Sequence, residues 1–457
     1  MRKSISGKGD GVQQARNDFG GMFMKRMARL MLHCRGQLEQ ENLIWNTVGS
    51  FLYALANMVL AFLVIRLAGE EAGGVFAIGF STFGQQMFTV SYYGLRPFHI
   101  TDSGPEGNGY SFGEYYRHRQ LTAAAAVICA ALYAVWRNGG GLYSPEKAAA
   151  VFMLAGYKII DGFADVYESE FQRQGCLYLT GKSVAFRTCL SAGTFLVTLA
   201  LTKSLLAACP AALLAQAAGV LLFDCSVIHR LGRVDFSRRK GQVGRIFSQG
   251  GLLFLSVFLD FYIFSAARYA IDLQMNDAAS GYFNLIFMPT SVIYLVANFV
   301  IRPVLTRMTV CWNGGDYRGF LAIMKRISGL IGVLTVIAVG GALLLGRPVL
   351  SIMEMVLGSG YAGALTDYVP AFAVIVLGGG VYAFGNLLYY GLVIMRLQKD
   401  IFFVYAAVAA AALVSSQVLV RWLGINGGAL AYCLFMAMQT AGFGLCVFRE
   451  FRRKRKG

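Results

Sequence analysis

Twelve continuous apolar runs, each long enough to cross a lipid bilayer, set the main constraint on how this chain folds. A helix that rises about 1.5 Å per residue needs roughly 20 residues to span about 30 Å of hydrocarbon. Membrane-spanning strands would appear instead as short segments of alternating polarity. The sequence therefore predicts an all-α polytopic membrane protein with about twelve transmembrane helices. The predicted helices cover residues 43–66, 73–98, 120–137, 147–170, 183–202, 205–228, 246–272, 280–303, 324–346, 367–394, 401–420 and 427–448.

Composition agrees with this class. Hydrophobic residues make up 56% of the chain and charged residues only 14%, whereas soluble domains contain about 25% charged residues. A soluble fold of 457 residues could not cover that much apolar surface, but a bilayer accepts it. The 54 glycines suit helices that approach one another closely in lipid.

The distribution of Lys and Arg predicts the orientation. Of the 41 basic residues, 33 lie on segments assigned to the inner side and six on segments assigned to the outer side. This bias predicts that both termini are cytoplasmic. It also accounts for the net charge of +17 without nucleic acid, and it makes anionic membrane lipids the expected partners of the basic ends. Two basic residues fit neither side, because Lys158 and Arg268 fall inside predicted helices.

A basic segment divides the predicted helices into two sets of six, and transporters are often built from two such bundles. The expected organisation is a basic cytoplasmic N-terminal segment 1–42, an N-lobe 43–228, a basic inter-lobe loop 229–245, a C-lobe 246–448 and a basic cytoplasmic tail 449–457. Residues 22–38 form either a basic amphipathic helix on the inner leaflet or an unstructured tail. Translation could start at Met1, Met22 or Met24.

Motifs for metals and nucleotides are absent or imperfect. The nine cysteines form no CxxC pair and the four histidines are isolated, so no metal site is predicted. The run from Gly358 to Gly363 matches GxGxxG but lies in a predicted outer loop without a βαβ unit. The run from Gly175 to Ser183 has one residue too many for a P-loop. Without an ATP site, transport must use an ion gradient, a membrane potential or cargo flow.

Charged residues inside the bilayer are costly and usually functional. The predicted helix 147–170 carries Lys158, Asp161, Asp165 and Glu168 at spacings of three, four and three, which places them on one stripe. One interpretation is the polar wall of a transport cavity. The other is an internal salt-bridge ladder near the end of the helix.

The predicted helix 246–272 carries a second set, with Asp260, Arg268 and Asp272. A guanidinium in a cavity suits phosphate or pyrophosphate, because its planar fork makes paired charge-assisted hydrogen bonds. The alternative is an Arg268–Asp272 bridge near the outer interface, since the two residues are spaced i,i+4.

Amides and helix breakers add weaker signals. Asn284, in the predicted helix 280–303, could line a sugar path or hold helices together. Pro289 in the same helix removes a backbone hydrogen bond and is a candidate hinge. Gly379 in the predicted helix 367–394 is a second candidate hinge. Both residues could equally serve static packing.

Several short runs, in this order and spacing, resemble the polysaccharide-transporter (O-antigen flippase-like) family of the multidrug/oligosaccharidyl-lipid/polysaccharide (MOP) flippase superfamily. The similarity extends over about residues 43–448. It rests on Tyr93 to Phe98 (YGLRPF), Thr101-Asp102, Tyr110 to Tyr116 (YSFGEYY), Glu168 to Gly175 (ESEFQRQG), Asp260, Gly281-Tyr282, Arg302-Pro303 and Gly358 to Tyr361.

The resemblance implies two six-helix lobes around a central cavity. It implies a flippase that moves an undecaprenyl-pyrophosphate-linked oligosaccharide across the bacterial cytoplasmic membrane for capsule, exopolysaccharide or O-antigen synthesis. Glycan polymerases and glycosyltransferases are then candidate partners. No bond is made or broken, so a transporter without catalytic residues or a cofactor is expected.

On this basis we hypothesise that Lys158 and Arg268 contact the anionic headgroup. Asp161, Asp165 and Asp260 would set the local charge or couple to H+ or Na+. The remaining cavity candidates are Glu168, Asn284 and Gln172, the last of which is similar to the glutamine at the exit of the family's fourth helix.

Other functions remain open. A cation-coupled multidrug exporter of the MATE type would favour an acid-dominated cavity, whereas Lys158 and Arg268 favour anionic or zwitterionic cargo. A non-transporting membrane scaffold for glycan assembly would leave both cations dispensable. A membrane-embedded glycan polymerase or ligase would present a large outer loop, but the predicted outer loops are short.

Overall fold

The computed structural model describes residues 31–34, 36–102, 104, 109–231 and 234–456, and every regular element within these ranges is a helix. Residues 22–30 of the predicted amphipathic helix, and the alternative start positions, lie outside the described residues. The chain is therefore a multi-pass helical membrane protein. Among the described residues, nine helical segments are long and apolar enough to cross a membrane.

Helices occupy each of the predicted spans. In the N-lobe they are α2 (Leu38–Ala68), α3 (Glu70–Phe76), η1 (Ala77–Thr82), α4 (Phe83–Tyr92), α5 (Arg96–Thr101), α6 (Phe112–Gly139), α7 (Pro145–Arg173), α8 (Leu177–Thr202), α9 (Leu205–Gly219), η3 (Val220–Cys225) and α10 (Ser226–Ile228). In the C-lobe they are α11 (Gln242–Gln274), α12 (Asp277–Ile286), α13 (Pro289–Asn313), α14 (Tyr317–Leu357), η4 (Ser359–Tyr361), η5 (Thr366–Tyr368), α15 (Val369–Ile394) and α16 (Gln398–Lys456).

Two predicted boundaries are wrong and a third is confirmed. The single helix expected over 73–98 is divided into α3, the π-helical η1 and α4, and it ends where Tyr93 takes left-handed backbone angles (φ 55°). The break expected between the last two spans is present at Gly424, whose non-helical φ and ψ of 58° and −135° divide α16 into two helices. The expected tail from residue 449 continues α16 as helix to Lys456. The number of membrane crossings and the cytoplasmic position of both termini stay predictions.

Local sequence explains several helix starts. Ser111 accepts a hydrogen bond from the backbone N–H of Glu114, whose carboxylate accepts one from the backbone N–H of Ser111, which forms a capping box at α6. Ser144 caps α7, and Pro145 follows it at the first helical position, where a missing N–H costs nothing. Asp316 caps α14 in the same way.

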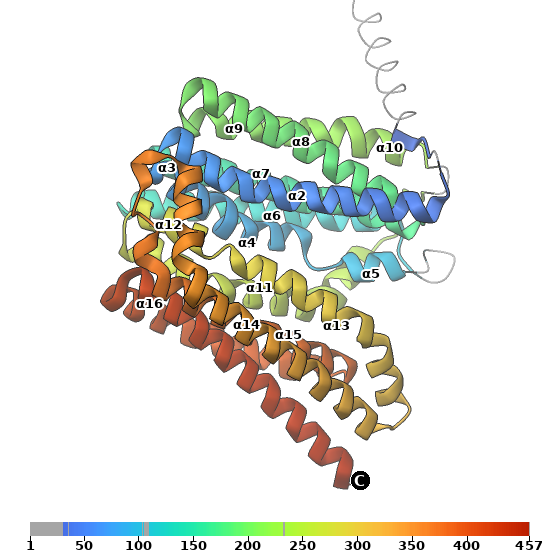
Figure 1. Cartoon of the computed structure of the whole chain (residues 1–457). Coiled ribbons are helices and arrows are strands. Elements are labelled where there is room, and N and C mark those ends of the chain that lie inside the picture. The colour runs from blue at the N-terminus through green and yellow to red at the C-terminus, as the bar shows by residue number, and fades with distance from the viewer. Residues whose placement is uncertain (1–30, 35, 103, 105–108, 232–233, 457) are drawn as a thin grey trace, which may run out of the picture.

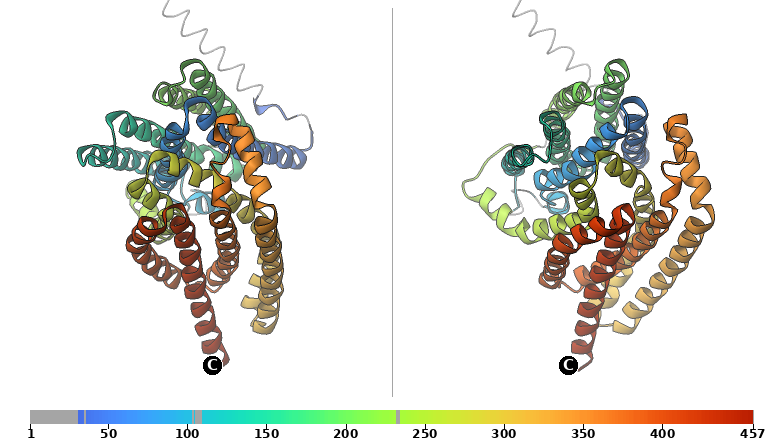
Figure 2. Two further views of the ribbon diagram at one scale, coloured as in Figure 1. Left: turned by 60° about the vertical axis from the view of Figure 1, so that its left-hand side comes forward. Right: turned by 90° about the vertical axis from the view of Figure 1, so that its left-hand side faces the viewer.

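The helices form two lobes that lie on opposite sides of the molecule, with α11 between them (Figure 1). The lobes meet where α3 contacts α12, at the ends predicted to face outward. From there they diverge, so that the turn between α13 and α14 and the C-terminal end of α16 lie far from α2 (Figure 1). Figure 2 shows the same division from two further directions, with the C-terminal part of α14 beside α2. The predicted two-lobe arrangement is present.

The contact between α3 and α12 requires glycine. A Cβ atom on Gly74 would lie 1.8 Å from the carbonyl oxygen of Asp277, a distance that no side chain could occupy. Gly281 of α12 packs against the backbone of α3 at Glu70 and Gly74. Small residues therefore let the backbones of α3 and α12 touch at this end of the lobes.

The inter-lobe segment is fixed to the N-lobe. The side chain of Arg239 donates to both carboxylate oxygens of Glu114, with Nε–Oε1 and Nη2–Oε2 distances of 3.0 Å. The backbone N–H of Arg239 also donates to Glu114 Oε1 at 3.0 Å. Because Glu114 belongs to the capping box of α6, this part of the segment moves with the N-lobe.

Candidate functional site

The predicted stripe of four ionisable side chains is present on α7. Lys158, Asp161, Asp165 and Glu168 are all buried, with at most 8% of each residue exposed. An ionised group that is removed from water needs hydrogen bonds or an opposite charge. The partners of these four groups therefore decide what the stripe can do.

Arg187 on α8 holds two acids of the stripe together with Asp224. Its Nη2 atom lies 2.6 Å from Glu168 Oε1 and 3.3 Å from Asp161 Oδ1, and its Nη1 atom lies 2.8 Å from Asp224 Oδ2. The hydroxyl group of Ser183 also donates to Asp224. Arg187 itself is only 1% exposed, so these ion pairs are shielded from solvent.

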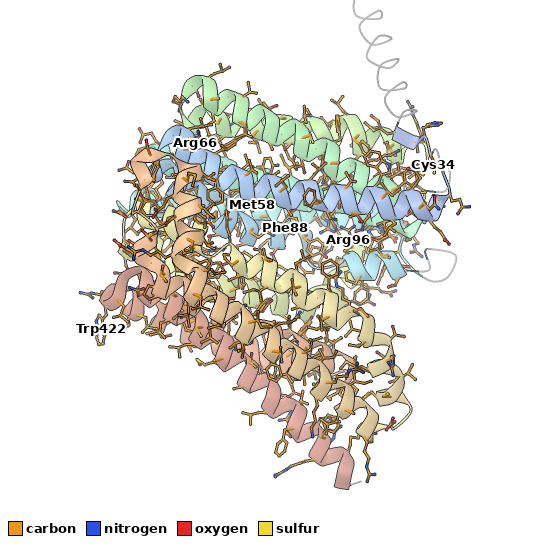
Figure 3. All side chains as sticks on the ribbon, in the orientation of Figure 1. Cys34, Met58, Arg66, Phe88, Arg96 and Trp422 are labelled. Carbon is orange, nitrogen blue, oxygen red and sulfur yellow. The ribbon has the colours of Figure 1, made fainter. Side chains whose placement is uncertain are left out.

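Two further arginines hold Asp165. Arg119 on α6 places Nη2 3.0 Å from Asp165 Oδ2, and Arg96 on α5 places Nη1 2.8 Å from Asp165 Oδ1. Arg96 also reaches Glu168 at 3.1 Å and Gln172 Oε1 at 3.4 Å. Its side chain is 27% exposed, and it lies where the N-lobe faces α11 (Figure 3).

Each acid of the stripe thus has an arginine partner from another segment. We refer to Asp161, Asp165, Glu168 and Asp224 with Arg96, Arg119 and Arg187 as the N-lobe network. This geometry favours the salt-bridge interpretation for the acids, although the bridges run between helices rather than along α7. Breaking such a buried pair by removing one partner leaves an uncompensated charge.

Lys158 stands apart from these ion pairs. Its Nζ atom donates to the hydroxyl group of Tyr53 at 3.0 Å and lies 3.9 Å from the centroid of the Phe80 ring. Tyr53 in turn donates to Asp161 Oδ2 at 2.9 Å. Among the described residues, no carboxylate lies within 4.0 Å of Lys158 Nζ. Among the described residues, Lys158 is therefore held by the Tyr53 hydroxyl group, by Asn57 Oδ1 at 3.5 Å and by the face of Phe80.

Arg268 on α11 has even fewer polar partners. Its Nη1 atom donates to the carbonyl oxygen of Ser81 at 3.4 Å, and its guanidinium lies 4.3 Å from the centroid of Phe287. Within the described ranges it forms no salt bridge, so the Arg268–Asp272 pair considered from the spacing does not form. Asp272 is bound instead by Arg137 and Lys147 of the N-lobe.

The π-helical segment η1 contacts both of these cations. Phe80 supplies the ring beside Lys158, and the next residue, Ser81, supplies the carbonyl group beside Arg268. Thr82 ends η1 with φ and ψ of −113° and −81°, outside the helical region. Single π-helical turns inside α-helices occur frequently at functional sites. The two cations therefore share one irregular segment of the N-lobe.

A narrow space between the lobes, too tight to hold a water molecule in this arrangement, adjoins Arg268. It has unusual polar groups, because Arg268 Nε, Thr82 Oγ1 and Ser280 Oγ are buried with no hydrogen-bond partner in the described part of the chain. Such groups are normally satisfied in native proteins. The residues that line this space are Ala77, Ile78, Thr82, Arg268, Ile271, Ser280, Phe283 and Asn284. The predicted cavity residue Asn284 is thus beside Arg268.

Asp260 lies elsewhere on α11, among hydroxyl and amide groups of the C-lobe. Tyr382 donates to its Oδ2 atom and Gln439 Nε2 to its Oδ1 atom, both at 3.2 Å. Tyr405 adds a further side-chain hydrogen bond. No Lys, Arg or His nitrogen of the described residues lies within 4.0 Å of this carboxylate. Among the described residues, Asp260 therefore shares no ion pair with the N-lobe network.

The two candidate hinges occupy different settings. Pro289 begins α13 directly after the break that separates it from α12. Gly379 lies inside the unbroken α15, where a Cβ atom would approach Ile293 Cδ1 of α13 to 2.9 Å. The first residue marks a discontinuity in the chain, and the second marks close packing.

Both nucleotide-motif look-alikes have structural roles. Lys182 donates to the carbonyl oxygens of Met31 and His33 at 3.1 and 2.9 Å, which ties the start of the described chain to α8. The loop after α14 folds around Glu354, whose carboxylate accepts from the backbone N–H groups of Gly363, Leu365 and Thr366. In the described ranges, no group of three or more His, Cys, Asp or Glu residues could hold a metal ion.

Sequence reasoning missed the arginines of the N-lobe network. Arg96, Arg119 and Arg187 were all counted with the inner side, as contributors to orientation. Arg187 nevertheless lies inside the apolar run 183–202, and a charged residue in such a run is the signal that could have identified it.

No protein-family model matches the chain, and no curated protein matches it in sequence. Solved structures of similar fold do exist. A multidrug resistance MATE family transporter of the MOP superfamily, in an inward-facing conformation, superposes with a TM-score of 0.66 at 12% identity, covering 91% of this chain and 99% of that one. Lipid II flippase MurJ, in an inward closed conformation, gives 0.68 at 13% identity, covering 88% of this chain and 87% of that one.

The Vibrio cholerae MATE transporter VcmN in its bent form gives a TM-score of 0.52 at 12% identity, covering 95% of this chain and 99% of that one. At this level of identity the likeness concerns the fold. The chain has the two-lobe helical fold seen in MATE transporters and in the flippase MurJ, both of which span nearly the whole of its length.

Proposed function

We propose that this protein is a flippase that moves an undecaprenyl-pyrophosphate-linked oligosaccharide from the inner to the outer leaflet of a bacterial cytoplasmic membrane. Its cargo would serve the synthesis of a surface polysaccharide such as capsule, exopolysaccharide or O-antigen. Sugars and pyrophosphate do not cross hydrocarbon unaided, because removing them from water costs too much. The polar headgroup would cross between the lobes while the lipid tail stays in the bilayer, and no bond would be made or broken.

The observation that carries this proposal is that the buried Arg268 side chain has no salt-bridge partner among the described residues. A guanidinium inside a membrane helix is normally neutralised, yet Arg268 has no carboxylate within 4.0 Å among the described residues. The unpartnered hydroxyl groups of Thr82 and Ser280 lie beside it, one from each lobe. A phosphate group would supply both the missing negative charge and acceptors for these donors.

Lys158 provides the second cation of the proposed headgroup site. It touches η1 through Phe80, as Arg268 touches η1 through Ser81, so the two positive charges flank one segment. A pyrophosphate carries negative charge on both phosphates and suits two separated cations. Asp161, Asp165 and Glu168 are already neutralised by arginines, so they would position the site rather than attract a cationic cargo.

A MATE-type multidrug exporter is the second candidate, and Asp260 is the observation that favours it. This carboxylate has no cation within 4.0 Å among the described residues, so it could accept a proton, a sodium ion or a cationic drug. Under the flippase proposal the same group would couple transport to H+ or Na+. Resistance assays with cationic drugs in expressing cells separate the candidates, because only the exporter protects the cells.

The decisive experiment combines deletion with one substitution. Deletion should cause lipid-linked oligosaccharide to accumulate on the inner leaflet while surface polysaccharide disappears. Complementation with Arg268→Ala should fail at normal protein levels, whereas Arg421→Ala, which removes an exposed arginine at the outer end, should restore export. Export by the Arg268→Ala protein at the parental rate would show that Arg268 does not contact the cargo. Glycan polymerases and glycosyltransferases would then be sought as partners only if deletion gives the expected accumulation.

A further inference from the structure

Four charged side chains join the lobes at their outer end, apart from the proposed headgroup site. Arg137 at the end of α6 and Lys147 at the start of α7 belong to the N-lobe. Asp272 at the end of α11 and Asp277 at the start of α12 belong to the C-lobe. Their charges cancel, and each acid is bound by a cation from the opposite lobe. We call these four residues the outer latch.

Asp272 is the centre of the outer latch. Its Oδ2 atom lies 2.8 Å from Arg137 Nη2 and accepts a hydrogen bond from the hydroxyl group of Tyr143. Its Oδ1 atom lies 2.8 Å from Lys147 Nζ, which also reaches Asp277 Oδ1 at 2.5 Å. Every bond to the Asp272 carboxylate therefore comes from the N-lobe, although Asp272 itself is part of α11.

Burial makes this contact selective for one arrangement of the lobes. The side chain of Asp272 is 0% exposed, that of Arg137 2% and that of Lys147 11%. Removing one partner leaves the other charge buried and uncompensated while the outer ends stay together, whereas an exposed pair would simply take up water. The outer latch thus favours the state in which the outer ends are together.

The neighbouring contacts place the outer latch on the closed side of the molecule. Asp277 carries the carbonyl group that approaches Gly74, where the backbones of α3 and α12 touch. Glu70 at the start of α3 accepts a hydrogen bond from Tyr282 on α12. Arg66 donates to the carbonyl oxygen of Val356 on α14 at 3.1 Å. The lobes diverge only away from this end (Figure 1).

The outer latch is also linked to Arg268 by the chain itself. Asp272 follows Arg268 by four residues, so the two side chains are one helical turn apart on α11. A movement of α11 that releases Asp272 from Arg137 and Lys147 must also move Arg268 relative to Ser81 of the N-lobe.

From these contacts we infer that Arg137, Lys147, Asp272 and Asp277 form an ionic gate, which holds the lobes shut on the outer side and must dissociate before the space beside Arg268 opens outward. The inference rests on the proposed function only in requiring that the protein alternates between two states. The nature of the cargo does not enter it.

The test measures access to the inter-lobe space from outside. Ser280→Cys places a thiol on the wall of that space, where the parent residue is 5% exposed. Intact cells that express the full chain are treated with a membrane-impermeant maleimide, and labelling of the parent's own cysteines is subtracted. Adding Asp272→Asn should raise the labelling rate of residue 280 about tenfold, because the population of outward-open molecules increases.

Asp400→Asn is the matched control. It also removes a carboxylate from an ion pair, but its partner Arg449 belongs to the same lobe, on the second of the two helices that Gly424 separates in α16, and the Arg449 side chain is 70% exposed. The labelling rate should not change in this variant. If Asp272→Asn reduces the amount of folded protein, Lys147→Gln provides the second test, because it opens two of the bonds and keeps Arg137 on Asp272.

A labelling rate that stays at the parental value in both latch variants overturns the inference. Because the readout is labelling and not export, this result is separate from failure of the flippase proposal. A protein that exports no glycan but becomes accessible on loss of Asp272 has the gate and lacks the proposed cargo.

Discussion

Arg187 and Glu168 form an ion pair of 2.6 Å between α8 and α7, with the arginine also bound to Asp161 and Asp224. One guanidinium therefore serves three carboxylates that are all buried in the N-lobe. This arrangement separates two kinds of charged residue in the membrane, namely those neutralised within the protein and those, such as Arg268, that are not.

Arg187→Gln should destabilise the folded protein severely. The substitution leaves buried carboxylates without their shared cation, and removing one partner of a buried ion pair costs about 3–5 kcal/mol. Thermal unfolding of the purified protein in detergent measures this directly. Arg421→Gln, at an exposed arginine, should unfold at the parental temperature. An unchanged unfolding temperature for Arg187→Gln would mean that the N-lobe network does not hold the lobe together.

Lys158→Met should leave the stability of the folded protein unchanged and reduce glycan export. Lys158 has no carboxylate within 4.0 Å among the described residues, so a side chain of similar length can replace it without stranding a buried anion. We expect an unfolding temperature close to that of the parent together with a strong loss of glycan export. Both quantities are measured on the same variant. Export at the parental rate would remove Lys158 from the proposed headgroup site.

The positions and order of the apolar helices could be predicted because the apolar runs have the length that a bilayer imposes. The break at Thr82 could not, because Ser81, Thr82 and Gly84 are compatible with an α-helix as well as with a π-helix. Only contacts with Lys158 and Arg268, which lie far away in the chain, distinguish this segment from the rest of its helix.

Charge pairing was predictable only where partners are close in sequence, and even there it was unreliable. Arg268 and Asp272 have the spacing of a helical ion pair, yet Asp272 is taken by Arg137, which precedes it by 135 residues. A fully buried carboxylate is best satisfied by the partners that converge on it in space. The sequence shows which charges enter the membrane, but it does not show which of them remain without a partner.

Thr82→Val should weaken ligand binding without weakening the fold. Thr82 is 0% exposed, and its hydroxyl group has no hydrogen-bond partner in the described part of the chain. Replacing this hydroxyl group with a methyl group therefore removes a desolvation cost of about 1–3 kcal/mol. The ligand-free protein should unfold at the parental temperature or slightly above it. Stabilisation by added undecaprenyl pyrophosphate should fall, because a ligand that binds more weakly stabilises the folded protein less at the same concentration.

The control for this prediction is undecaprenol, which has the same tail and no phosphate. Undecaprenol should raise the unfolding temperature of both proteins by less than undecaprenyl pyrophosphate raises that of the parent. If Thr82→Val and the parent gain equally from undecaprenyl pyrophosphate, the pocket beside Arg268 does not bind the headgroup.

Asp260→Asn should uncouple export from its energy source. The amide keeps the size of the side chain, and its one oxygen can still accept a hydrogen bond from Tyr382 or Gln439, but it can neither take up a proton nor neutralise a sodium ion. We therefore expect low export that no longer responds when the proton or sodium gradient is collapsed, at protein levels equal to those of Asp400→Asn. Export is followed as the appearance of glycan at the cell surface, with each gradient dissipated separately. Export by the parent protein should fall when only one of the two gradients is collapsed, so the same experiment identifies the coupling ion. An Asp260→Asn protein that responds to this gradient as the parent does would exclude Asp260 as the coupling group.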